Sequence, residues 1–209
     1  MIPVKILALR YLPGADPGLA RALGAPKGHT SLGILTTDCD DATYIALDAA
    51  TKAADVEVAY ARSFYAGSAN ASTPNAGEVI GILAGTNPGA VRSGMDAAIA
   101  ALSRVGFEET DSVPYLAHTV SSVGSFLSKE ADVPFGSAIA YLIAPPLEAM
   151  YAMDAALKAA DVKLCKLYAP PSETNFGGGL LSGTQSACQA ACTAFAAAVK
   201  DVAQRPKKE

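Results

Sequence analysis

The sequence predicts an α+β fold built from two similar domains in tandem, each a mainly antiparallel sheet covered by helices. Three observations support this fold class. With 209 residues, of which 51% are hydrophobic and 17% charged, the chain is long enough for one large or two small domains. A nine-residue helical motif occurs twice, and the strands and helices around both copies follow the same order. Tight connections between strands favour an antiparallel sheet over a doubly wound parallel one.

The repeated motif is Asp48–Val56, which returns as Asp154–Val162, 106 positions later, with eight identities in nine. Alanine matches mean little in an alanine-rich chain, whereas the matched Asp, Lys and Val residues are informative. The repeat therefore predicts one domain over residues 1–105 and a second over residues 106–209, each of an ordinary domain size.

The elements of each half follow in order from the hydrophobic pattern. Apolar and β-branched runs predict two opening strands in each half, at residues 4–11 and 30–37 and at residues 113–121 and 138–144. The repeated helix comes next, over residues 43–54 in the first half, followed by two strands joined by a loop rich in Gly, Ser, Pro and Asn. The first strand of each such pair covers residues 57–64 or 163–168, and the second ends at Gly85 or Gly183.

A final helix closes each half. Its apolar positions recur at i, i+4, i+7 and i+11, which is the spacing of one helix face. Asn87 with Pro88 predicts the start of the first of these helices, and Thr184 caps the second. The two stripes match 97 positions apart: Val91, Met95, Ala98 and Leu102, then Cys188, Cys192, Phe195 and Val199. Both cysteines are therefore expected in a core rather than on a metal ion.

Charge and composition exclude several function classes. The net charge of −4, without clustered Lys and Arg, argues against a nucleic-acid partner. The most apolar run, residues 138–144, is far shorter than the roughly 20 residues that span a membrane, and the N-terminus lacks a secretion signal, so we expect a cytoplasmic protein. His29 and His118 accompany no nucleophile motif, and we expect no catalytic residue, metal or cofactor. Gly177–Gly179 is predicted to lie in a loop. A weakly charged surface of this kind favours an oligomer.

The acidic cluster Asp38, Asp40 and Asp41 is the most informative polar feature. These carboxylates precede or begin a helix, where they can cap free backbone N–H groups. Together with Glu78 at the head of a later strand, they can also line a hollow that binds a cation. Two further acid–base pairs stand at i, i+4 spacing inside the repeated motif, Asp48 with Lys52 and Asp154 with Lys158, and can be surface ion pairs.

The duplicated helix motif resembles the bacterial microcompartment shell domain, and its late position in each half resembles the circularly permuted tandem shell proteins, with their ferredoxin-like domains. Further segments are similar to the ethanolamine-utilisation class of these proteins and extend the likeness over nearly the whole chain: residues 36–52, 61–72, 76–79, 140–162 and 170–176. The resemblance implies a homotrimer whose six domains imitate a hexagonal tile and join other shell proteins in a sheet. It also implies a shell location in the cytoplasm.

The resemblance further implies roles for individual residues. Lys52 and Lys158 fall at the position of the family's tile-edge lysine, and the loops 65–75 and 170–179 fall where family members build a central pore, with Tyr65, Ala66 and Gly67 as the gate. A small channel in each subunit is implied to bind ethanolamine or a similar small polar metabolite. The residues at the matching positions are Asp40, Asp41, Glu78, Phe107, Thr174, Asn175 and Phe176.

The sequence thus predicts a structural shell protein with a gated pore for small metabolites. One alternative is a tandem-domain shell protein of a different metabolosome. A second is a ring-forming regulator that binds a small molecule but builds no sheet. A third is an enzyme that uses the acidic cluster with a divalent metal.

Overall fold

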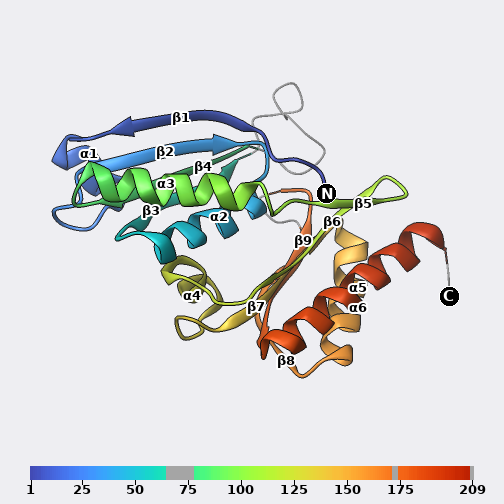
Figure 1. Cartoon of the computed structure of the whole chain (residues 1–209). Helices are drawn as coiled ribbons and strands as arrows, with labels where there is room; N and C mark the ends of the chain where they lie inside the picture. Colours follow the sequence, from blue (N-terminus) through green and yellow to red (C-terminus); the bar gives the residue numbers. More distant parts are fainter. Residues whose placement is uncertain (65–77, 171–173, 208–209) are drawn as a thin grey trace. The chain divides into compact units, whose positions relative to one another are not determined.

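In the computed structural model, which describes residues 1–64, 78–170 and 174–207, the chain forms two compact units (Figure 1). The N-terminal unit consists of Pro3–Gly106 together with the segment Gly124–Leu127. The C-terminal unit consists of Phe107–Val123 and Ser128–Glu209 together with Met1–Ile2. The domain boundary at residues 105 and 106 stays a prediction.

The N-terminal unit contains a four-stranded antiparallel sheet in the order β1-β2-β4-β3, formed by β1 (Ile6–Leu12), β2 (Ser31–Thr37), β4 (Glu78–Gly85) and β3 (Glu57–Phe64). Helices α2 (Asp40–Ala53) and α3 (Pro88–Leu102) lie side by side on one face (Figure 1). Gly33 and Gly81 turn toward these helices, against Met95 and Leu47. The alternate residue Leu32 faces the other way and packs with Ala20 of the short helix α1 (Pro17–Ala22).

The C-terminal unit repeats this plan with one added strand. Its sheet has the order β5-β6-β7-β9-β8, formed by β5 (Glu108–Thr110), β6 (Val113–Val120), β7 (Ala138–Ala144), β9 (Gly177–Gly183) and β8 (Val162–Tyr168). Helices α5 (Pro146–Ala159) and α6 (Gln185–Gln204) pack against it, and α4 (Ser125–Ala131) joins β6 to β7. Met153, Leu181 and Phe195 are among the buried residues of the core, as are Cys188 and Cys192, which confirms the predicted place of these cysteines.

The two sheets agree strand by strand, because β1-β2-β4-β3 corresponds to β6-β7-β9-β8. Even a local irregularity recurs, since the register shifts between Val58 and Tyr60 in β3 and between Leu164 and Lys166 in β8, at positions 106 apart. The predicted α+β class, with helices on antiparallel sheets, is confirmed.

The structure corrects the prediction at three places. Helix α2 begins at Asp40, three residues before the predicted Thr43. The glycines Gly177–Gly179 form the start of β9 instead of a loop. The strand requires glycine at residue 178 (φ +150°), because a side chain there would overlap the carbonyl of Leu142 in the neighbouring strand. The short elements α1, α4 and β5 were not predicted.

Candidate functional site

The first turn of α2 places two carboxylates in a buried position. Asp40 and Asp41 follow the N-cap residue Cys39, and their exposed fractions are 4% and 7%. One carboxylate oxygen of Asp40 accepts the N–H of Asp41 at 2.9 Å, which satisfies one of the free N–H groups of the helix. Capping is therefore part of the role of Asp40, yet a buried carboxylate also calls for a positive partner.

The third carboxylate of the acidic cluster has a structural task. Asp38 is buried, and its Oδ1 accepts the N–H of Lys5 at 2.8 Å, while the Asp38 N–H donates to the Lys5 carbonyl at 3.2 Å. These two bonds fix the residues that lead into β1 against the end of β2. Asp38 is thus separated in function from the pair that follows it.

Burial raises the pKa of Asp40 from 3.8 to about 6, and contacts with Ser63 and with the Asp41 backbone and side chain oppose this rise. The Ser63 hydroxyl on β3 is itself buried and forms no hydrogen bond of normal geometry within the described part of the chain. This hydroxyl can donate to the neighbouring Asp40 carboxyl after a small shift, or it can bond to water or to a ligand. The neighbouring thiol, Cys39, also has a raised pKa, because of burial and the charge of Asp41, and stays neutral.

The sheet register brings the start of β4 to the same corner. Phe64 pairs with Glu78, and the preceding residue, Ser63, pairs with Val79. Ser63 is the residue of β3 that lies beside Asp40. The backbone of Glu78 in β4 is therefore opposite the next residue of β3, Phe64. The Glu78 side chain is outside the described residues.

The other predicted ligand residues belong to the C-terminal unit. The rings of Phe107 and Phe176 are buried and pack together with centroids 5.5 Å apart. The Phe107 carbonyl accepts the N–H of Ile2 at 2.6 Å and keeps one lone pair for a further donor. Thr174 accepts the N–H of Phe176 at 3.3 Å through its hydroxyl, and Asn175 is exposed. The two aromatic side chains therefore stabilise the unit, and only polar atoms near them are suited to a ligand.

The predicted gate residues Tyr65, Ala66 and Gly67 lie outside the described residues. Both predicted tile-edge lysines are among the described residues, and they differ in exposure and in the burial of their acidic partners. Lys52 is 30% exposed and pairs with the fully buried Asp48 at 3.1 Å, whereas Lys158 is 75% exposed and pairs with the exposed Asp154 at 2.6 Å.

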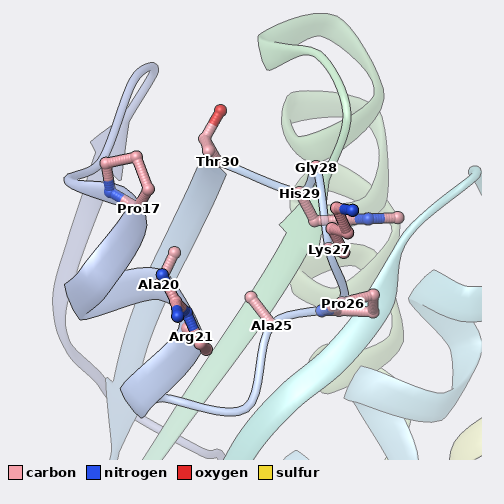
Figure 2. Close-up of a pocket in the computed structure, with 9 residues that line it drawn as sticks. All are labelled: Pro17, Ala20, Arg21, Ala25, Pro26, Lys27, Gly28, His29 and Thr30. Atoms are coloured by element: carbon pink, nitrogen blue, oxygen red, sulfur yellow. The ribbon is translucent and has the colours of Figure 1, made fainter.

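A separate pocket of about 370 Å³ lies between α1 and the segment 25–30 (Figure 2). Arg21, Lys27 and His29 are among its lining residues, and the Nδ1 of His29 is buried with no partner in the described part of the chain. The lining is basic, which is the wrong charge for an ammonium ligand. None of the predicted ligand residues lines it.

The residues that the structure describes bear on metal binding and on membrane insertion. They contain no group of three or more His, Cys, Asp or Glu side chains placed to hold a metal ion. Among their helices, none combines the length and the apolar character needed to cross a membrane.

Comparisons of the sequence and of the structure with known proteins point to the same family. Residues 31–114 match the BMC domain. The bacterial microcompartment shell protein EutL of Clostridium perfringens is 57% identical over 99% of this chain and 97% of its own. The crystal structure of the ethanolamine utilization protein EutL from Leptotrichia buccalis superposes with a TM-score of 0.93 at 57% identity, covering 100% of this chain and 98% of that one. A trimeric shell protein, PduB, shares the fold at 18% identity, with a TM-score of 0.80 over 96% of this chain and 90% of its own.

Proposed function

The chain belongs to the EutL group of bacterial microcompartment shell proteins, and from this premise we propose that three copies form a tile with a gated pore and with binding sites for a small ammonium metabolite. Membership makes it a structural protein of a microcompartment shell, not an enzyme. The trimer, the gate and the ligand are the parts that need experiments.

The buried carboxyl pair at the start of α2, with the Ser63 hydroxyl beside it, is the single observation that supports a ligand site most strongly. An ammonium group can donate charge-assisted hydrogen bonds to Asp40 and Asp41. A ligand hydroxyl can pair with Ser63, and Thr174 belongs to the proposed ligand set. Ethanolamine carries both groups, and the L. buccalis relative is named for its utilization. Glu78, Phe107, Asn175 and Phe176 complete the proposed ligand set, and Lys52 and Lys158 the proposed tile edge.

Calorimetry with three ligands tests the site. We expect ethanolamine to bind at pH 7.5, ethylene glycol not to bind, and propylamine to bind more weakly because it lacks the hydroxyl. Asp40→Asn should abolish binding, Ser63→Ala should weaken it, and Asp16→Asn, at the N-cap of α1, should leave it unchanged. If wild type and Asp40→Asn bind ethanolamine equally, the acidic pair has no role in binding and serves only to cap the helix.

Electron microscopy of the purified protein tests the tile. Rings that join a lattice, alone or with another shell protein, support the proposal. Rings that never join one support the regulator alternative, and a monomer at all concentrations contradicts the trimer. For the gate, Tyr65→Ala should increase passage of small polar solutes through reconstituted shells, and unchanged passage would remove Tyr65 from that role.

A further inference from the structure

The pocket between α1 and the segment 25–30 takes no part in the proposed ammonium site, and its charge is the opposite of that site's (Figure 2). Its volume of about 370 Å³ suits a small molecule. Its lining includes three basic residues, Arg21, Lys27 and His29, and no acidic one. Because the whole chain carries a net charge of −4, this concentration of basic side chains is a local feature. The pocket therefore suits an anion.

The basic side chains of the pocket lack partners within the described part of the chain. Arg21 and Lys27 pair there with no carboxylate, whereas Lys52 and Lys166 each do. The Nδ1 of His29 is buried and also has no hydrogen-bond partner among the described residues. A buried polar atom without a partner is uncommon in folded proteins. A bound anion supplies acceptors for all three groups, with the imidazole proton on Nδ1.

Backbone hydrogen bonds form the walls of the pocket and do not involve these side chains. Before α1, the N–H of Ala15 donates to the Thr30 carbonyl at 2.7 Å. After α1, the N–H of Ala25 donates to the Ala20 carbonyl at 3.0 Å. The apolar part of the lining consists of two prolines and two alanines, Pro17, Ala20, Ala25 and Pro26. These residues offer a surface for the organic part of a ligand.

The second repeat shows that the turn beside the pocket does not depend on basic residues. Residues 25–28, Ala-Pro-Lys-Gly, correspond to residues 133–136, Val-Pro-Phe-Gly, 108 positions later. Both glycines have a left-handed φ, +88° and +84°, and in each turn the next residue donates its N–H to the proline carbonyl, at 3.0 and 3.1 Å. Phe135 and Ser137 stand where the first repeat has Lys27 and His29. The same turn thus forms with uncharged residues, so its two basic side chains are available for a ligand.

We propose that this pocket binds a phosphate monoester with a small organic group. The Arg21 guanidinium offers two parallel N–H donors, and Lys27 and His29 add one donor each. A phosphate monoester presents three terminal oxygens and a charge of about −1.5 to −2, which fits this set better than a carboxylate with two oxygens and one charge. The site is independent of the proposed ammonium site, because α1 and α2 lie on opposite faces of their sheet.

Calorimetry with four probes tests the ligand class. Phenyl phosphate should bind, and phenol, which lacks the anion, should not. Inorganic phosphate lacks the organic group and benzoate lacks the third oxygen, so each should bind about 5-fold more weakly or worse. No binding of phenyl phosphate, or an affinity equal to that of any of the other three probes, would overturn the proposal.

Variants of the basic residues test the site. Arg21→Gln and Lys27→Gln should each weaken phenyl phosphate binding about 10-fold or more, because each removes a charge-assisted hydrogen bond. His29→Ser, which introduces the residue of the second repeat, should weaken it about 3-fold. Lys163→Gln is the matched control, since it removes the same charge from an exposed lysine on β8 and should leave the affinity unchanged. Unchanged affinity in both Arg21→Gln and Lys27→Gln, or an equal loss in Lys163→Gln, would contradict the site.

Nuclear magnetic resonance supplies a readout within the wild-type protein. The chain has two histidines, His29 in the pocket and His118 on β6, and His29→Ser assigns their imidazole signals. Phenyl phosphate should shift the signals of His29 and leave those of His118 unchanged. If both histidines shift equally, or if His29 does not shift while calorimetry shows binding, the ligand lies elsewhere and the proposal is wrong.

Discussion

The two copies of the nine-residue motif place the same acid and the same base in opposite surroundings. Asp48 is fully buried and accepts three hydrogen bonds or ion-pair contacts, from Gly124, Leu127 and Lys52. Asp154 has an exposed fraction of 63% and pairs with Lys158 of its own helix. A repeated motif therefore conserves the local helix geometry, while the segment packed against it decides what each side chain contributes to stability.

The largest effect is expected at Asp48. Asp48→Ala leaves two buried N–H groups and a half-buried lysine without their acceptor, so the free energy of unfolding should fall by about 3–5 kcal/mol. Asp154→Ala should change it by about 0.5 kcal/mol or less, because the pair is exposed. Urea denaturation at one protein concentration measures both. Equal losses would show that the two motif copies are energetically alike.

The next effect concerns the start of the two helices, where Asp40-Asp41 in α2 corresponds to Pro146-Leu147 in α5. Because the pKa of Asp40 is raised from 3.8 to about 6, the folded protein holds this proton more tightly than the unfolded chain, and stability falls as pH rises between these values. Asp40→Asn should therefore stabilise the ligand-free protein by about 3 kcal/mol at pH 7.5 and by little at pH 4.

Thermal unfolding at both pH values measures this difference, with Glu148→Gln in the first turn of α5 as the control. A gain of the same size at pH 4 and pH 7.5 would mean that ionisation of Asp40 is not its cause.

A smaller effect is expected from the close approach that lets Gly124–Leu127 cover α2. A side chain at Gly124 would overlap the Thr51 hydroxyl and come within 2.6 Å of the Asp48 carbonyl. Gly124→Ala should cost about 1–3 kcal/mol. Gly14→Ala, where nothing lies within 4 Å, should be nearly neutral in the same denaturation experiment. A neutral Gly124→Ala would show that the segment can shift without loss.

The lysines give the smallest change in stability and the sharpest test of the tile edge. Lys52→Ala should cost about 1 kcal/mol, because it removes a partner of the buried Asp48, whereas Lys158→Ala should be neutral. Loss of sheets in micrographs after Lys158→Ala, with trimers intact, would support the edge role. Normal sheets with both lysines replaced would refute it.

The repeat, five strands to within one residue at each end, and the cap residues of α3 and α6 could be predicted because each rests on a local pattern. The helices α1 and α4 were missed because their six and seven residues are too short for a helical periodicity to show. The predicted start of α2 at Thr43 is three residues late, because the N-cap is Cys39, whose side chain makes no cap hydrogen bond and so gives no signal in the sequence.

The candidate site was predictable only in part. Asp40 and Asp41 stand out in the sequence, but Ser63 does not, because its place beside Asp40 depends on how α2 packs on β3. The role of Asp48 was also hidden, since its hydrogen-bond partners Gly124 and Leu127 stand 76 and 79 positions away. The i, i+4 spacing with Lys52 indicated a surface pair, and tertiary packing overrode that interpretation.

Gly124–Leu127 packs with the N-terminal unit although it follows residue 105 in the chain. A fragment cut after residue 105 loses the four residues that cover α2 and satisfy Asp48, so it should be insoluble or bind a peptide carrying them. We therefore expect that the two halves could become independent single-domain proteins only if another segment took over this role at α2.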